Sequence, residues 1–445
     1  MSNLEDARAA FIRACVWHGS LDQAEAILTA NPEIAASDIY TAALLGDDAG
    51  VRRFLALDPG YATAKGGPLG WDALTHLCFS KYLRLDLARM QGFVNAATAL
   101  LDAGASANTG FWEENHQPKP EWESALYGAA GVAQHAEMTQ LLMERGADPN
   151  DEEVPYHSPE TYDNAALKIL VESGKLNADS QSTMLLRKAD WHDYEGIKYL
   201  LEKGVDPNRM TRWGYTALHQ AIRRDNALKI VEVMLDHDAD FSLPNRQDGR
   251  TAASIAAWRG RGDVLGLLQS RGVRVEMRPL ERLLAACALD DGAQVRAMAA
   301  AEPGLVRELI TIGGTVLAEF SGTGSAGVRW LLELGIPVDA LYKEGDGYFG
   351  TATNSTALHV AAWRAQHQAV KLLLDRGAAV NARDGQGRTA LQLAVRACVD
   401  SYWSYRRLPE SVEALLRAGA SAQGIAVPCG YPEVDALLQA GPPLQ

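Results

Sequence analysis

The sequence predicts an all-α solenoid made of stacked helix pairs, and three observations lead to this prediction. A sequence pattern that begins at Thr356 begins again at Thr389, so the repeat is about 33 residues long. Within a repeat, small residues come first and a leucine-rich run follows, as expected for two helices that pack against neighbouring copies. A glycine closes the leucine-rich run in most copies, where a helix has to stop.

The clearest copies lie in residues 205–275 and 350–422. One copy opens with Gly-Tyr-Thr-Ala-Leu-His at 214–219, and the next opens with Gly-Arg-Thr-Ala at 249–252. The sequence Asp-Pro-Asn at 148–150 and 206–208 predicts a turn into the following hairpin. The predicted helix-stop glycines are Gly104, Gly146, Gly174, Gly204, Gly272, Gly335, Gly377 and Gly419.

Each element of the best-preserved copy has a physical reason. Thr356 is a good N-cap for the first helix, and His359 can tie neighbouring turns together by hydrogen bonds. Ala361 and Ala362 are small, so the first helix can approach the next repeat closely. The apolar side chains of Val-Lys-Leu-Leu-Leu at 370–374 then fill the space between successive layers.

This pattern of Thr-Ala-Leu-His, paired alanines, Leu-Leu and Gly closely resembles the ankyrin repeat family. The resemblance is strong in 205–275 and 350–422 and weaker elsewhere, and it implies about twelve helix pairs over nearly the whole chain. It also implies a partner bound along a concave face. We therefore expect one ankyrin-repeat array over residues 1–445. Its expected sections are degenerate repeats at 1–65, repeats with long hairpin insertions at 66–275, irregular repeats at 276–345, consensus-like repeats at 346–422 and a C-terminal cap at 423–445.

Composition narrows the possible partners. The chain has 42 Lys and Arg against 56 Asp and Glu, and its formal charge of −14 disfavours nucleic acid and anionic membrane surfaces. The N-terminal segment lacks the apolar stretch of a secretory signal, and no stretch is long and apolar enough to span a bilayer. Five widely spaced cysteines form no metal-ligand pattern. We expect a cytoplasmic protein with neither a metal nor another cofactor.

Four segments exceed the repeat pattern and are expected to form loops. Residues 109–121, 151–159 and 341–354 fall where ankyrin hairpins project, and insertions that recur on one face of a solenoid usually mark its binding face. Residues 399–408 instead lengthen a turn between two helices, which predicts a position on the opposite rim.

Aromatic residues at the predicted hairpins and inner helices are the candidates for partner binding, because Trp and Tyr dominate binding hot spots. Trp258 and Trp363 share a register with Trp17 near the end of the inner helix, where an indole can either line a groove or pack between repeats. The sequence leaves both alternatives open. The candidates are Trp71, Trp112, Trp122, Trp213, Tyr215, Tyr348, Trp258 and Trp363.

Sequence patterns that would indicate a catalytic or cofactor-binding site are weak. Gly-Thr-Gly-Ser-Ala-Gly at 322–327 matches a dinucleotide-binding pattern, but the segment before it reads as a helix rather than a strand. The charged run 190–195 is interpreted as a solvated turn between helices, and His219 and His359 as structural residues of the repeat. If the protein is an enzyme, the loop residues His116, Glu113, Glu114 and His157 are the candidates for proton transfer.

Two functional classes follow. The first is a non-catalytic module that binds another protein on its concave face, and the family resemblance and the weak chemical motifs favour it. The alternative is an enzyme or a small-molecule-binding protein with an aromatic-lined pocket in the concave groove. A closed cavity lined by Trp112, Tyr348, Trp363 and His116 would favour this alternative.

Overall fold

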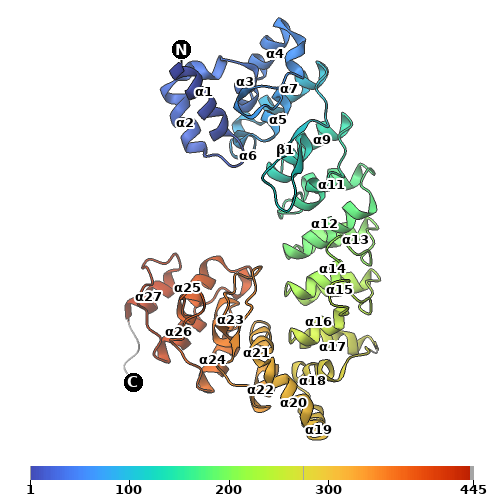
Figure 1. Cartoon of the computed structure of the whole chain (residues 1–445), viewed down its shortest axis with the longest axis vertical. Helices are drawn as coiled ribbons and strands as arrows, with labels where there is room; N and C mark the ends of the chain where they lie inside the picture. Colours follow the sequence, from blue (N-terminus) through green and yellow to red (C-terminus); the bar gives the residue numbers. More distant parts are fainter. Residues whose placement is uncertain (1, 274, 441–445) are drawn as a thin grey trace. The chain divides into compact units, whose positions relative to one another are not determined.

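The computed structural model describes residues 2–273 and 275–440 of the chain (Figure 1). Helices make up most of these residues, and two short two-stranded sheets are the only sheets among them. The predicted all-α solenoid class is confirmed. The chain divides into two compact units, and the division falls within one helix pair. Unit 1 comprises Met1–Ala221 and Val233–Ala239, and unit 2 comprises Ile222–Glu232 and Asp240–Gln445.

Unit 1 begins with helix pairs that alternate between a first and a second helix along the chain (Figure 1). A π-helical turn, Gly128–Val132, extends α8. The helices up to the division are α1 (Ser2–Cys15), α2 (Leu21–Ala30), α3 (Ile39–Leu45), α4 (Asp48–Leu57), α5 (Ala73–Cys78), α6 (Lys81–Leu85), α7 (Met90–Asp102), α8 (Ala125–Tyr127), α9 (Ala136–Glu144), α10 (Glu153–His157), α11 (Ala165–Glu172), α12 (Ala178–Asp190), α13 (Tyr194–Glu202), α14 (Ala217–Arg223) and α15 (Leu228–Asp236).

Unit 2 continues the pattern, with one additional helix, α20, before α21. Its helices are α16 (Ala252–Trp258), α17 (Gly262–Ser270), α18 (Pro279–Ala288), α19 (Gly292–Ala301), α20 (Pro303–Thr311), α21 (Gly313–Ser321), α22 (Ala326–Glu333), α23 (Ala357–Trp363), α24 (His367–Asp375), α25 (Ala390–Asp400), α26 (Glu410–Arg417) and α27 (Pro432–Ala440). Strands β3 (Leu341–Tyr342) and β4 (Ser355–Thr356) form its sheet, and β1 (Gly110–Glu113) and β2 (Glu121–Ser124) form that of unit 1.

The first helices of successive repeats pack on one another, as α3 does on α5 and α23 on α25. Small side chains permit this approach, because Ala361 and Ala362 of α23 are completely buried. Gly377, which follows α24, has φ +81°, a conformation that favours glycine, so the predicted helix stop is confirmed there.

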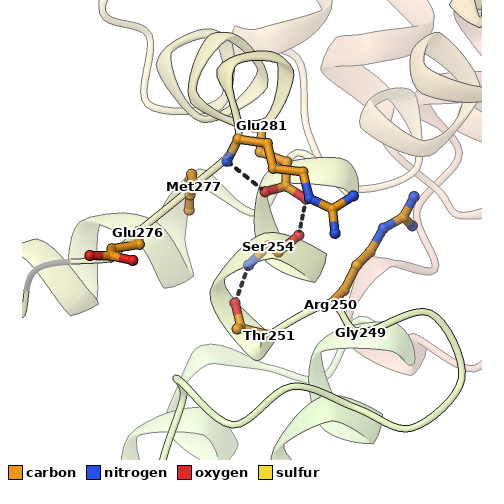
Figure 2. Close-up of a pocket in the computed structure, with 8 residues that line it drawn as sticks. Gly249, Arg250, Thr251, Ser254, Glu276, Met277 and Glu281 are labelled. Atoms are coloured by element: carbon orange, nitrogen blue, oxygen red, sulfur yellow. Dashed lines mark hydrogen bonds between the residues drawn. The ribbon is translucent and has the colours of Figure 1, made fainter.

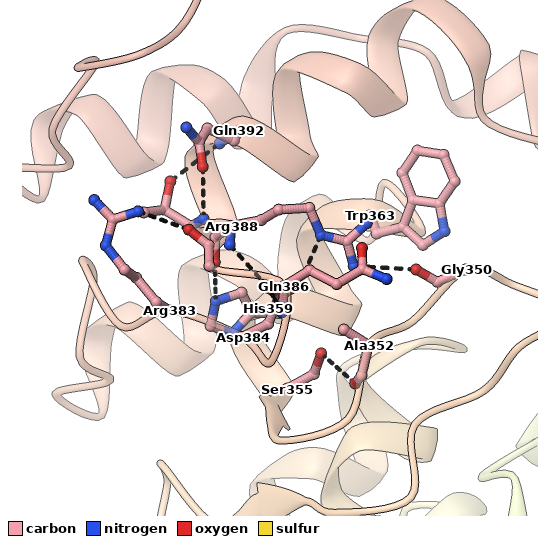
Figure 3. Close-up of polar contacts among 12 residues, drawn as sticks. Gly350, Ala352, Ser355, His359, Trp363, Arg383, Asp384, Gln386, Arg388 and Gln392 are labelled. Atoms are coloured by element: carbon pink, nitrogen blue, oxygen red, sulfur yellow. Dashed lines mark hydrogen bonds and ion pairs between the residues drawn. The ribbon is translucent and has the colours of Figure 1, made fainter.

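His359, the last residue of the Thr-Ala-Leu-His segment, links one repeat to the next (Figure 3). The Nδ1 atom of His359 lies 2.8 Å from the hydroxyl of Thr356 and 3.2 Å from its backbone nitrogen. Its Nε2 atom lies 3.0 Å and 3.1 Å from the carbonyl oxygens of Ala382 and Arg388 in the following hairpin. His359 therefore has partners on both ring nitrogens, as the structural interpretation predicts.

The prediction for residues 399–408 was wrong. This insertion reaches the hairpin loop 341–354 instead of staying on the opposite rim, because aromatic side chains of the two segments pair. Tyr402 stacks on Tyr348 with ring centroids 5.6 Å apart, and Trp403 stacks on Phe349 at 5.4 Å.

Candidate functional site

Two of the predicted partner-binding residues are buried. Trp71 stacks on Phe111 with centroids 4.0 Å apart, and the indole nitrogen of Trp363 donates a hydrogen bond to the carbonyl oxygen of Phe349. Trp17, in the same register as Trp363, packs edge-on against neighbouring aromatic rings. These contacts give the indoles a packing role, and Trp71 and Trp363 expose very little surface to a partner.

Trp258, Tyr348 and Tyr215 are half-buried and lie on separate repeats. Trp258 contacts Arg250 and Glu281, which line a cavity of about 300 Å³ in unit 2 (Figure 2). The guanidinium of Arg250 lies 4.3 Å from the centre of the Trp258 ring. Glu281 accepts hydrogen bonds there from the hydroxyl of Ser254 and the indole nitrogen of Trp258. The lining residues are Gly249, Arg250, Thr251, Ser254, Glu276, Met277, Arg278 and Glu281. This lining carries two charges of each sign, so it does not select an anion over a cation.

The remaining predicted aromatics lie in unit 1, on the hairpin β1–β2 and the loops that follow it. Trp112 and Trp122 are opposite each other on the two strands, with centroids 5.4 Å apart. Trp112 is 58% exposed. Trp213 lies 5.4 Å from the ring of Tyr156, which also contacts the ring of His157.

His157 ends the short helix α10 and is held between two carboxylates. Its Nε2 atom lies 3.0 Å from Glu153, and its Nδ1 atom lies 2.9 Å from Glu160. Burial alone would lower the pKa of His157, but the hydrogen bonds to these carboxylates and their charges raise it to about 9. His157 is therefore a cation at neutral pH, with both ring nitrogens occupied.

A chain of polar contacts continues from Glu160 across the neighbouring repeats. Arg187 of α12 forms ion pairs with both Glu160 and Asp190 and places its guanidinium 4.0 Å from the ring centre of Tyr156. Gln220 of α14 donates a hydrogen bond to Asp190. The chain of contacts thus joins three consecutive repeats.

The interpretation of residues 190–195 as a solvated turn was wrong. Asp190 and Asp193 are both buried. Asp193 accepts a hydrogen bond from the ammonium of Lys188 at 2.8 Å, and Lys188 is itself completely buried. Buried charges require such partners, so this turn is part of the polar core between α12 and α13.

On the other side of His157, two carboxylates lack partners for one oxygen each. Glu123 of β2 is 2% exposed, and its Oε2 atom has no hydrogen bond. Asp151 precedes α10, and its Oδ2 atom is likewise buried without a partner. Burial and the nearby charge of Glu153 raise the pKa of Glu123 to about 8, and burial raises that of Asp151 to about 6.

We call this group of side chains the His157 cluster. Among these residues, the sequence indicated His157 as a candidate for proton transfer and placed Asp190 in a solvated turn. The signal that was missed is the spacing of Glu153, His157 and Glu160, which are four and three residues apart and so lie on one side of a helical turn. The cluster comprises Glu123, Asp151, Glu153, His157, Glu160, Arg187 and Asp190.

The other predicted proton-transfer residues make local contacts on the hairpin. The Nδ1 atom of His116 lies 3.1 Å from the carbonyl oxygen of Lys119, and Glu113 accepts a hydrogen bond from the backbone of Asn115. Glu114 is exposed. These three residues therefore do not assemble with His157 into one acid–base group.

The described residues show no metal-binding cluster, dinucleotide site or membrane-spanning helix. Within residues 2–273 and 275–440, no group of three or more His, Cys, Asp or Glu side chains is arranged to hold a metal ion. The glycine-rich segment 322–327 follows helix α21, so the strand that a dinucleotide site requires is missing there. Among the same residues, no helix combines the length and apolar character needed to cross a membrane.

Stacked helix pairs with projecting hairpins define this chain as a helical repeat protein. A family model described as ankyrin repeats (3 copies) matches residues 185–278, and one described as ankyrin repeats (many copies) matches residues 331–394. These matches show that the chain contains ankyrin repeats. Ankyrin repeats generally serve as modules for protein–protein interaction.

Two curated relatives share one segment with this chain. It is similar to the potassium channel AKT1 of Oryza sativa subsp. indica and to that of subsp. japonica, each 36% identical over 81 residues. This segment is 18% of the present chain and 8% of each channel. The likeness therefore spans less than a tenth of the relatives.

Proposed function

We propose that this protein is a non-catalytic module that binds a protein partner through the face of unit 1 that carries the β1–β2 hairpin. The observation that carries the proposal is Trp112, a large aromatic side chain that is 58% exposed on strand β1. Rigid aromatic side chains supply contact area at little entropic cost and are enriched at binding hot spots.

The hairpin holds Trp112 firmly in place. Side chains alternate along a strand, so Phe111 points inward and packs on Trp71, while Trp112 points outward against Trp122. The two strands approach so closely at Gly110 that an added Cβ atom would lie 2.2 Å from the carbonyl oxygen of Glu123. A fixed hairpin loses little conformational freedom when a partner binds.

An enzyme or a small-molecule-binding protein is the alternative, and the His157 cluster does not favour the enzyme. A general base must be unprotonated at working pH, whereas His157 has a pKa raised to about 9 and both of its ring nitrogens are occupied. The predicted cavity would need Trp112 and His116 of unit 1 together with Tyr348 and Trp363 of unit 2. The aromatic-lined cavity therefore stays a prediction.

The test is affinity capture with the full chain as bait, in which Trp112→Ala is compared with the unchanged chain. Tyr162→Ala is the matched control, because Tyr162 is a 64% exposed aromatic residue of the same unit. We expect the control to retain a captured protein that Trp112→Ala loses by at least about tenfold. Equal recovery of every captured protein with Trp112→Ala would contradict the proposal.

A further inference from the structure

The His157 cluster holds more negative than positive groups. Its five carboxylates face two cations, the imidazolium of His157 and the guanidinium of Arg187. These cations pair with the carboxylates of Glu153, Glu160 and Asp190. Glu123 and Asp151 are therefore left without a cation, so the ionised form of either carboxyl is costly in this buried site.

The unpaired oxygens of Glu123, Asp151 and Gln134 belong to residues that contact α10 or lie on a segment packed against it. Asp151 accepts a hydrogen bond from the backbone nitrogen of Val154 at 2.8 Å and interacts with the hydroxyl of Ser124, yet its Oδ2 atom is buried without a hydrogen bond. Glu123 is paired across the sheet with Phe111 and interacts electrostatically with Glu153 and Asp151. Gln134 donates its amide to the carbonyl oxygen of His157 at 3.2 Å and leaves its own side-chain oxygen unpaired. With Glu123 ionised, these three unpaired atoms can only accept hydrogen bonds, so the group that would satisfy them is a donor; the hydroxyl of Ser158, also buried without a partner, can donate or accept.

We propose that the His157 cluster binds the ammonium group of a lysine side chain from the protein partner; this inference rests on the proposed function. An ammonium carries a positive charge and three N–H donors, which matches the unpaired acceptors and the excess negative charge. The ring of Tyr127, 5.1 Å from that of His157, adds an aromatic face of the kind that attracts cations. The formal charge of −14 on the chain further favours a basic partner.

The cluster reaches the surface at one edge, whereas its unpaired oxygens are buried, and it is not arranged for a metal. The side chains of His157 and Glu160 are 27% and 28% exposed, so the cluster reaches the surface there. Within residues 2–273 and 275–440, no three of its carboxylate and imidazole groups meet closely enough to hold a metal ion. An organic cation does not need several ligands at metal-binding distances, because it forms separate hydrogen bonds to separate oxygens.

A proton occupies part of the site when no cation is bound. The pKa of Glu123, raised to about 8, leaves this carboxyl mainly protonated at pH 7. An arriving ammonium lowers the pKa of Glu123 because opposite charge favours the ionised form. Binding at pH 7 therefore transfers a proton from the Glu123 carboxyl to the buffer.

The first test is thermal unfolding of the full chain in n-butylammonium chloride, a mimic of the lysine side chain, against sodium chloride of equal ionic strength. We expect the amine to raise the midpoint by about 3 °C in the unchanged chain and to have at most half this effect in Glu123→Gln. Glu114→Gln is the matched control and keeps the full shift, because Glu114 is an exposed residue of the same hairpin.

Tetramethylammonium chloride supplies the same charge without N–H donors, and we expect it to give no shift. The proposal is overturned if n-butylammonium does no better than sodium chloride, if Glu123→Gln responds fully, or if tetramethylammonium is as effective. Propylguanidinium that stabilises the chain more than n-butylammonium would also overturn the assignment to lysine.

Calorimetry in two buffers of different ionisation enthalpy provides a second readout. We expect n-butylammonium to release part of a proton at pH 7 from the unchanged chain and none from Glu123→Gln. Even if Glu123→Gln alters folding, absent proton release from the unchanged chain overturns the proposal. These tests use no protein partner. Failed amine binding with Trp112-dependent capture intact would therefore overturn this inference alone. Failed capture with amine binding intact would overturn the proposed function and, with it, the assignment of the ammonium to a partner's lysine.

Discussion

His157 shows how a buried ionisable residue makes the stability of unit 1 depend on pH. Burial opposes its charge, but the carboxylates of Glu153 and Glu160 outweigh burial and raise its pKa from 6.5 to about 9. Folding therefore increases proton binding at this residue. The stability that its charge contributes is complete below about pH 6.5 and is lost as the pH rises through 9. Ionisation of Glu123, whose pKa is raised to about 8, acts in the same direction.

His157→Gln removes the cation that faces two carboxylates. We expect the free energy of unfolding at pH 6 to fall by about 2–3 kcal/mol, because Glu153 and Glu160 lose a charged partner in a partly buried site. We also expect a flatter loss of stability between pH 6.5 and 9. Urea denaturation followed by circular dichroism at pH 6, 7.5 and 9.5 measures both effects.

The matched control is His116→Gln, which changes a histidine on the hairpin outside the His157 cluster. We expect it to alter the free energy of unfolding by less than about 0.5 kcal/mol at each pH. A His157→Gln profile parallel to that of the unchanged chain would show that His157 does not titrate with the raised pKa.

The residues of this cluster also show what the sequence can predict. His157 is recognisable because it lies in a segment that exceeds the repeat pattern. Glu123 is not, because only the register of the hairpin decides which strand residues face inward. Arg187 reads as an ordinary helix residue, and its pairing with Glu160 depends on how one repeat stacks on the next.

At the scale of elements, the insertion at 399–408 connects parts of unit 2 that are distant in sequence. Trp403, only 1% exposed, stacks on Phe349 and donates its indole N–H to the carbonyl oxygen of Asp225 at 3.4 Å. The carboxylate of Asp225 also lies 3.3 Å from Arg406 and 3.4 Å from Arg261. Asp225 and Trp403 are 178 positions apart, so no repeat pattern could predict this contact.

Trp403→Ala removes the centre of this connection. We expect the stability of unit 2 to fall by about 3–5 kcal/mol, the usual cost of truncating a fully buried large aromatic side chain. Hydrogen exchange should accelerate in residues 222–232 and 341–354, which lose their contacts with the insertion. Tyr405→Ala is the control, because Tyr405 is an exposed residue of the same insertion. Unchanged exchange in both segments with Trp403→Ala would refute the connecting role.

Helix pairs were more predictable than insertions for a physical reason. A repeat makes most of its contacts with its immediate neighbours, so local spacing of small residues, leucines and glycines is enough to indicate the pairs. Ala361 and Gly377 behave as that spacing predicts. An insertion such as 399–408 has no equivalent in the neighbouring repeats. Its contacts therefore depend on its own side chains and do not follow from the repeat pattern.

At the scale of the whole molecule, the cysteines provide a reporter for each compact unit. Cys15 and Cys78 are buried in unit 1, and Cys287 and Cys398 are buried in unit 2. Burial raises the pKa of all four thiols, to about 12 for Cys287 and about 11 for Cys398, so each should react slowly while its unit is folded. Cys429 is the more accessible thiol.

Pulse labelling of these thiols with iodoacetamide over a urea series should therefore separate the two units. We expect His157→Gln to lower the urea concentration at which Cys15 and Cys78 become labelled and to leave that for Cys287 unchanged. We expect Trp403→Ala to lower the urea concentration for Cys287 and to leave that for Cys15 and Cys78 unchanged. Mass spectrometry of the labelled peptides measures each thiol separately, with Cys429 as the internal standard. If all four buried thiols become reactive at one urea concentration in both variants, the two units unfold as one, because each substitution then destabilises both units equally.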